Sequence, residues 1–175
     1  MSAIDYDLTK IKGFAFDVDG VLSPATVQIN TEGVPVRMAN VKDGFAIRQA
    51  VILGYPIAII TGGNSEDIKK RYNLLGVTDV FLNSQNKKAD LEQWMKKYGL
   101  GSEEVLYMGD DIPDLQCMRT VGLSCTPFDG CHEAKMTAVY VSKYTGGYGS
   151  ARDVIEQVLR AKRQWKLDSC ASYTY

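Results

Sequence analysis

Short apolar runs alternate with amphipathic segments along nearly the whole 175-residue chain. The first, second and fourth runs are almost wholly apolar, which is typical of strands buried on both faces of a parallel sheet. The alternation predicts an α/β fold with a doubly wound, mainly parallel sheet. We expect its strands at residues 12–16, 56–60, 79–82, 104–108, 122–125 and 138–141.

The segments between these runs repeat apolar residues at helical spacing, and several end at a glycine, as helices often do. They predict helices over residues 43–54, 65–76 and 88–99 and from about 150 to 165, with Ser65 as an N-cap. The residues expected to face the core are Ile47, Val51, Ile68, Tyr72, Leu75, Leu91, Trp94, Met95, Val154, Val158 and Leu159.

One stretch, residues 26–38, alternates apolar and polar residues around a Glu32-Gly33 turn. This pattern predicts a β-hairpin. Because it lies between the first strand and the first helix, we expect it to project from the carboxyl edge of the sheet. We interpret residues 1–175 as one domain with this hairpin insertion and a polar tail at 166–175.

Charge and composition exclude several classes of protein. The 20 basic and 21 acidic residues leave no basic stripe for nucleic acid. No apolar run approaches the roughly 20 residues that span a bilayer, and the N-terminus lacks a signal-peptide pattern. Four cysteines without a CxxC pair and a single histidine argue against a zinc site or a disulfide framework. We therefore expect a soluble, cytoplasmic protein that binds neither membrane nor nucleic acid.

Polar side chains follow four of the predicted strands. In parallel α/β sheets the carboxyl ends of the strands meet where ligands bind. Each position alone has an ordinary interpretation: an N-cap aspartate, a turn, a solvated lysine, or acidic residues at a helix N-terminus. Their occurrence at successive strand ends favours a functional site. The residues are Asp17, Asp19, Thr61, Gly62, Gly63, Lys87, Asp110, Asp111 and Asp114.

The combination resembles the haloacid dehalogenase superfamily of phosphotransferases. The motifs that carry the resemblance are "DVDG" (17–20), "TGG" (61–63), Lys87 and "GDDIPD" (109–114). The first and fourth are specific, and the other two are weak without them. The resemblance implies Mg²⁺-dependent phosphoryl transfer through an aspartyl-phosphate.

In those roles Asp17 would attack phosphorus, because a carboxylate is a competent nucleophile. Asp19 would protonate the leaving alkoxide and later deprotonate water. Mg²⁺ prefers oxygen ligands, which Asp17, the Asp19 backbone carbonyl and Asp110 would supply.

The remaining motif residues would serve the phosphate and the metal. The Thr61 hydroxyl and the Gly62 and Gly63 amides, at a helix N-terminus, would bind phosphate oxygens. Lys87 would oppose the negative charge of the transition state. Asp114 would orient Lys87, and Asp111 would support the water shell of the metal.

About forty residues separate the first two motifs, which leaves no room for a full cap domain. The chain is therefore similar to the capless branch and, more narrowly, to the 3-deoxy-D-manno-octulosonate 8-phosphate phosphatases of lipopolysaccharide biosynthesis. This resemblance implies a homotetramer in which the hairpin closes a neighbour's site. It also implies substrate contacts from Asn40, Val41, Lys42, Asp43, Gly44, Arg48, Gly62, Gly63 and Arg71.

Several alternatives stay open. Gly63 and Tyr148 stand where the family often carries cations, so 2-keto-3-deoxy-nononate 9-phosphate is a second candidate substrate. Arg71 and Asp67 are four residues apart and could form only a surface ion pair. A receiver-type signalling domain also has aspartates, a hydroxyl and a lysine at strand ends. Such a domain needs no acid/base two residues after the phosphorylated aspartate, so Asp19 argues against it.

Overall fold

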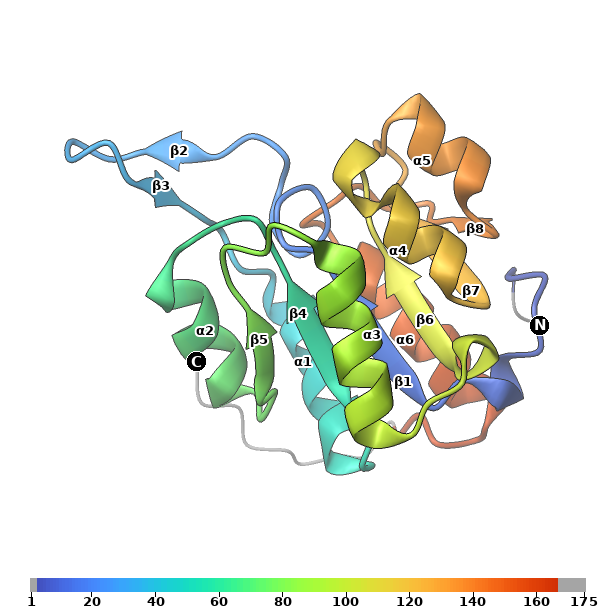
Figure 1. Cartoon of the computed structure of the whole chain (residues 1–175). Coiled ribbons are helices and arrows are strands. Elements are labelled where there is room, and N and C mark those ends of the chain that lie inside the picture. The colour runs from blue at the N-terminus through green and yellow to red at the C-terminus, as the bar shows by residue number, and fades with distance from the viewer. Residues whose placement is uncertain (1–2, 167–175) are drawn as a thin grey trace.

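The computed structural model describes residues 3–166 of the chain. Six parallel strands form one sheet in the order β5-β4-β1-β6-β7-β8 (Figure 1). The six predicted strands are confirmed to within two residues at each end. The predicted tail at 166–175 lies, beyond its first residue, outside the described residues. The strands are Gly13–Phe16 (β1), Ile57–Ile60 (β4), Asp79–Phe81 (β5), Val105–Met108 (β6), Leu123–Thr126 (β7) and Tyr140–Val141 (β8).

Helices cover both faces of the sheet, as the doubly wound prediction requires. Side chains alternate along β1, so Phe14 and Phe16 face one core and Ala15 faces the other. Helices α1, α2 and α6 pack on the phenylalanine side, and α3, α4 and α5 pack on the opposite side. Their bounds are Val41–Ile52 (α1), Glu66–Leu74 (α2), Lys87–Tyr98 (α3), Leu115–Thr120 (α4), His132–Thr137 (α5) and Ser150–Ala161 (α6).

The predicted apolar stripes all face these cores, with Val51 half-buried and the others buried. Helix boundaries differ more. The first helix begins at Val41 rather than Asp43, because the Asn40 side chain accepts hydrogen bonds from the amides of Lys42 and Asp43. Ser65 holds the N-cap position of α2 without a side-chain bond, and α6 ends at Ala161 rather than near 165.

The strand order creates a switch point beside β1. The chain proceeds from β1 to β4 and β5 on one side, and then crosses to β6 on the other side. The carboxyl ends of β1 and β6 are therefore neighbours, with Phe16 paired to Met108. Ligand sites of open α/β sheets form at such a point.

The predicted hairpin is present and projects away from the sheet (Figure 1). It consists of β2 (Gln28–Ile29) and β3 (Pro35–Val36), paired antiparallel, with Gly33 at a φ of +78° in the turn. Only the hairpin and α1 lie between β1 and β4, so there is no cap domain there. Ile29, Val34 and Val36 are exposed on it.

Asp43 joins α1 to the start of α6. Its side chain is 2% exposed, and Oδ1 accepts a hydrogen bond from the backbone N of Arg152 at 2.7 Å. Oδ2 has no hydrogen-bond partner among the described residues. Burial raises the pKa of Asp43 to about 6, although the bonds from the Arg152 and Gly149 amides oppose the shift.

This carboxyl should make stability fall as pH rises. Between about pH 4 and pH 6 the folded protein keeps a proton on Asp43 that the unfolded chain has lost. The free energy of unfolding of the wild type, relative to Asp43→Asn, should therefore decrease by about 2–3 kcal/mol across this window. Urea titrations at several pH values measure it, with the exposed Asp67→Asn as control. Parallel pH profiles for wild type and Asp43→Asn would contradict the prediction.

Candidate active site

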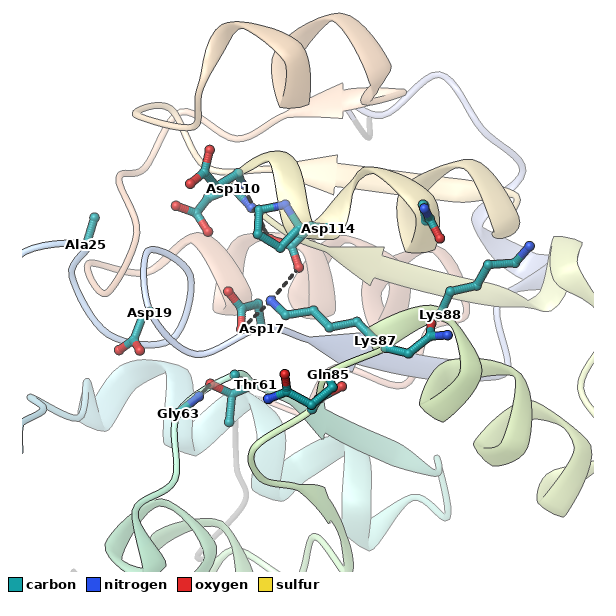
Figure 2. Close-up of a pocket in the computed structure, with 16 residues that line it drawn as sticks. Asp17, Asp19, Ala25, Thr61, Gly63, Gln85, Lys87, Lys88, Asp110 and Asp114 are labelled. Carbon is teal, nitrogen blue, oxygen red and sulfur yellow. Dashed lines mark hydrogen bonds and ion pairs between the residues drawn. The ribbon is translucent and has the colours of Figure 1, made fainter.

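A cavity of about 730 Å³ opens at the carboxyl edge of the sheet. It contains most of the residues that follow the predicted strands, as Figure 2 shows. Loops that end β1, β4, β5 and β6 contribute to it, so the sheet topology brings four sequence motifs together. The motif residues that line it are Asp17, Asp19, Thr61, Gly62, Gly63, Lys87, Asp110, Asp111 and Asp114.

Asp17, Lys87 and Asp114 form a buried charged group at the floor of this cavity. Nζ of Lys87 lies 3.0 Å from Oδ1 of Asp17 and 2.8 Å from Oδ1 of Asp114. The three side chains are at most 10% exposed. Burial and then the charge of Asp114 raise the pKa of Asp17, and Lys87 opposes them. Burial lowers the pKa of Lys87, but the two aspartates outweigh it and raise that pKa above its usual value.

Asp114 contacts Lys87, Tyr107 and two backbone amides, and so holds the buried charged group in place. Its Oδ1 also accepts a hydrogen bond from the Tyr107 hydroxyl at 2.6 Å. Its Oδ2 accepts from the backbone N of Asp110 at 3.1 Å and of Asp111 at 3.4 Å. These donors and Lys87 fix the direction of both carboxylate oxygens of Asp114. Asp114 therefore orients Lys87 toward Asp17, consistent with the role expected from sequence.

The loop after β4 lies against the loop after β5. The backbone N of Ser84 donates to the Thr61 carbonyl, and that of Asn83 donates to the Gly63 carbonyl, both at 2.9 Å. Thr61 is buried, and its Oγ1 accepts from the Gly63 amide at 3.0 Å. Helix α2 begins only at Glu66. Gly62 and Gly63 therefore lie four and three residues before the helix, and their amides do not form its N-terminus as expected.

The Asp110 carboxylate packs closely against the backbone of the loop that follows β1. At Gly20, whose φ is +87°, an added Cβ would lie 1.9 Å from Oδ2 of Asp110. Only glycine suits both this backbone conformation and the close approach. Burial raises the pKa of Asp110 to about 7, with further contributions from Asp114 and Asp111.

Oxygens of Asp17, Asp110 and Asp114 lie within 4.8 Å of one another. Because Asp114 is already occupied by Lys87, Tyr107 and two amides, Asp17 and Asp110 are the better ligands. Crowded, buried carboxylates with raised pKa values need a cation, and an all-oxygen donor set suits Mg²⁺. The described residues therefore fit the predicted metal.

Asp19 is held by a residue that the sequence analysis missed. Arg37, just after β3 of the hairpin, donates from Nε to Oδ1 at 2.6 Å and from Nη2 to Oδ2 at 2.7 Å. A signal was available, since Arg37 is the one basic residue within 26–38. Tyr107 was also missed, although a tyrosine in a buried strand requires a partner for its hydroxyl.

Of the residues expected to contact the substrate, Gly62 and Gly63 line the main cavity and the others do not. Asn40 caps α1 and donates from Nδ2 to the Gly147 carbonyl at 3.0 Å. Asp43 is buried under α6, while Val41 and Lys42 are exposed. Gly44 is covered by Arg71, whose Nη2 would lie 2.8 Å from a Cβ at that position.

The two arginines differ in placement. Arg71 lines a second cavity of about 190 Å³ between α2 and the base of the hairpin, together with Arg37. Arg48 donates to the carbonyl of Leu75 at 3.4 Å, at the C-terminal end of α2. That end of the helix points away from the main cavity, so the structure does not bring Arg48 to the site in this chain.

Comparisons with known proteins agree with this geometry. A family model described as haloacid dehalogenase-like hydrolase matches residues 46–122. The 3-deoxy-D-manno-octulosonate 8-phosphate phosphatase KdsC of Escherichia coli K12 is 35% identical over 158 residues, which cover 90% of this chain and 83% of that protein.

Two solved phosphatases of the same name have the same fold. The one from Yersinia pestis superposes with a TM-score of 0.87 at 30% identity, covering 90% of this chain and 85% of its own. The one from Moraxella catarrhalis, solved in complex with a magnesium ion, a phosphate ion and a KDO molecule, gives 0.84 at 34% identity, with 89% of each chain covered. The chain therefore belongs to the haloacid dehalogenase-like hydrolase family, among relatives that are 3-deoxy-D-manno-octulosonate 8-phosphate phosphatases.

Proposed function

We propose that this protein is a Mg²⁺-dependent phosphatase that hydrolyses 3-deoxy-D-manno-octulosonate 8-phosphate to the sugar acid and phosphate. One observation carries the chemistry: the buried Asp17 carboxylate faces a 730 Å³ polar cavity with Lys87 3.0 Å from its Oδ1. The named relatives support the substrate. Their substrate and this chain's 35% identity to the Escherichia coli enzyme favour it over 2-keto-3-deoxy-nononate 9-phosphate.

Hydrolysis takes two steps, both at phosphorus. An oxygen of Asp17 attacks the phosphorus atom, and the bond from phosphorus to the substrate oxygen breaks as Asp19 gives that oxygen a proton. Water then attacks the aspartyl-phosphate and gives a proton to Asp19. The bond from phosphorus to Asp17 breaks, which releases phosphate and restores the carboxylate.

The other residues of the cavity hold the phosphoryl group. Lys87 donates toward the phosphoryl oxygens and is kept in place by Asp114. The Thr61 hydroxyl and the Gly62 amide supply donors from the opposite side of the cavity. Asp17, Asp110 and the Asp19 backbone carbonyl would hold Mg²⁺, with Asp111 near its water shell. When bound, Mg²⁺ supplies charge neutralisation for the phosphoryl oxygens.

The receiver-domain alternative is not favoured. Asp19 lines the same cavity as Asp17, where a hydrolase needs an acid/base and a phospho-acceptor domain does not. A receiver domain would keep the phosphoryl group on its aspartate, whereas Asp17 with Asp19 in the same cavity would release phosphate and react again.

We further propose that the protein acts in the cytoplasm as a single catalytic domain spanning residues 1–175. Cys117, Cys125 and Cys131 are free thiols, which suits a reducing compartment. Among the described residues, no helix has the length and hydropathy to cross a bilayer.

A substrate panel tests the function. The purified protein should release phosphate from 3-deoxy-D-manno-octulosonate 8-phosphate faster than from the nononate 9-phosphate or neutral sugar phosphates. A chelator should abolish the release and added Mg²⁺ should restore it, because Asp17 and Asp110 require a cation. Faster turnover of neutral sugar phosphates than of acidic ones would refute the sugar-acid assignment. Full activity in the presence of chelator would show that the reaction does not require a metal.

Lys87 and its neighbour Lys88 form a matched pair of variants. Lys87→Met leaves Asp17 and Asp114 buried without their cation, which should cost about 3–5 kcal/mol of stability and nearly all activity. Lys88 is exposed, lines the outer part of the same cavity and lies 3.6 Å from Glu92. Lys88→Met should therefore cost less than about 1 kcal/mol, and it serves as the control for the loss of stability. Chemical denaturation and a phosphate-release assay measure both. Similar behaviour of the two variants would show that the buried ion pairs have no special role.

We propose that the protein is a homotetramer in which each hairpin closes a neighbour's site. Exposed Ile29, Val34 and Val36 on a two-stranded hairpin are more apolar surface than an isolated hairpin tolerates. A second copy of the chain would cover these side chains, and the hairpin would in turn close the open cavity of that copy.

Light scattering should accordingly give four times the chain mass of 19.4 kDa. Val36→Glu should dissociate the assembly and lower activity, because a charge would be buried at the interface. Val139 is similarly exposed away from the hairpin, so Val139→Glu should leave mass and activity unchanged. A wild-type monomer at micromolar concentration would disprove the tetramer.

A further inference from the structure

The guanidinium of Arg37 lies between the acid/base residue and the phosphate loop. It binds both carboxylate oxygens of Asp19, at 2.6 and 2.7 Å, and its side chain is 14% exposed. Its Nη2 also lies over Gly63, where an added Cβ would be 2.8 Å away. The absence of a side chain at position 63 therefore leaves the space that Arg37 occupies.

This ion pair is incompatible with proton transfer by Asp19. Both oxygens of the carboxylate accept hydrogen bonds from one rigid fork. Neither can then give a proton to a leaving oxygen or take one from water. In Figure 2 the Asp19 carboxylate is set apart from the Asp17–Lys87 contact, although it lines the same cavity. Asp19 must leave Arg37 before the reaction proceeds.

Leaving Arg37 without an anion would be costly, because a largely buried charge would lose its partner. A second carboxylate can replace Asp19 with the same two-pronged geometry. The surroundings allow it. The charged residues that line the 190 Å³ cavity are Arg37, Arg71 and Asp67. Because the Asp67 carboxylate is exposed and lies 3.3 Å from Nζ of Lys70, the two arginines leave this cavity suited to an anionic group that extends beyond the phosphate pocket.

We propose that Arg37 is a positioning residue whose guanidinium exchanges one anion for another. It binds Asp19 in the free enzyme and binds the carboxylate of the substrate in the complex, so that Asp19 is released only when a sugar-acid phosphate is bound. The inference rests on the proposed function. It makes Arg37 a determinant of specificity: a phosphate ester without a carboxylate must open the Arg37–Asp19 pair with nothing to replace it.

The test compares two substrates and three variants. The substrates are 3-deoxy-D-manno-octulosonate 8-phosphate and p-nitrophenyl phosphate, which has no carboxylate. The variants are Arg37→Gln, Arg37→Lys and the control Arg160→Gln, whose arginine pairs with Glu156 on α6. Circular dichroism and thermal unfolding first establish that each variant is folded.

Arg37→Gln should lower kcat/KM for the sugar-acid phosphate by about 30- to 150-fold, mainly through KM, because a charge-assisted contact is lost. The same variant should raise kcat for p-nitrophenyl phosphate by about fivefold, since Asp19 is no longer paired. Arg37→Lys keeps the charge without the fork and should show an intermediate KM for the sugar acid. Arg160→Gln should match the wild type on both substrates.

Equal losses of kcat/KM on both substrates for Arg37→Gln, or no change on either substrate, would overturn the proposed exchange. If Arg37→Gln does not fold, Arg37→Lys decides: a raised KM confined to the sugar acid supports the proposal, and uniform losses refute it. Failure of the proposed function is distinct, because the wild type would then hydrolyse no sugar-acid phosphate, whatever the variants do.

Discussion

The ion pairs of Lys87 with Asp17 and Asp114 are the interaction on which the site depends. A carboxylate buried at the end of a parallel strand is expensive unless donors surround it. Lys87 lies 3.0 Å from one aspartate and 2.8 Å from the other, and Asp114 is fixed in turn by Tyr107 and two backbone amides. This network holds the Asp17 carboxylate in place, with its side chain 8% exposed. Lys87 starts α3, whereas the aspartates follow β1 and β6, so the network also ties three elements together.

The sheet topology makes this arrangement possible. β1 lies between β4 and β6, so four loops from distant parts of the sequence meet at one edge. Glycine then allows the close packing of those loops. At Gly20 the Asp110 carboxylate occupies the place of a side chain, and at Gly63 the Arg37 guanidinium does. A larger residue at either position would displace a charged group of the site.

Much of the fold could be predicted from the sequence because its signals are local. The apolar run ending at Phe16, the stripe formed by Leu91, Trp94 and Met95, and the Glu32-Gly33 turn each reflect short-range periodicity. The motif residues that line the main cavity followed from the family resemblance and the rule that sites form at carboxyl edges, whereas the order of the strands was not predicted.

Contacts between distant segments could not be predicted in this way. Arg37 reaches Asp19 because the chain returns from the projecting hairpin past Gly63 of the loop after β4, and no periodicity encodes that contact. Asn40, Asp43 and Arg48 were expected at the substrate, yet their contacts in the described chain are with helix caps and carbonyls. Their expected roles in substrate binding, like the single-domain interpretation, stay predictions.

The proposed hydrolysis requires a covalent bond between Asp17 and phosphorus. This requirement can be tested directly by acid-quenching the enzyme during turnover and reducing it with borohydride, which converts an acyl phosphate on aspartate to homoserine. Peptide mass spectrometry should find homoserine at position 17, dependent on both substrate and Mg²⁺, and absent from Asp17→Asn. An unmodified Asp17 during steady turnover, or homoserine at another aspartate, would contradict the account.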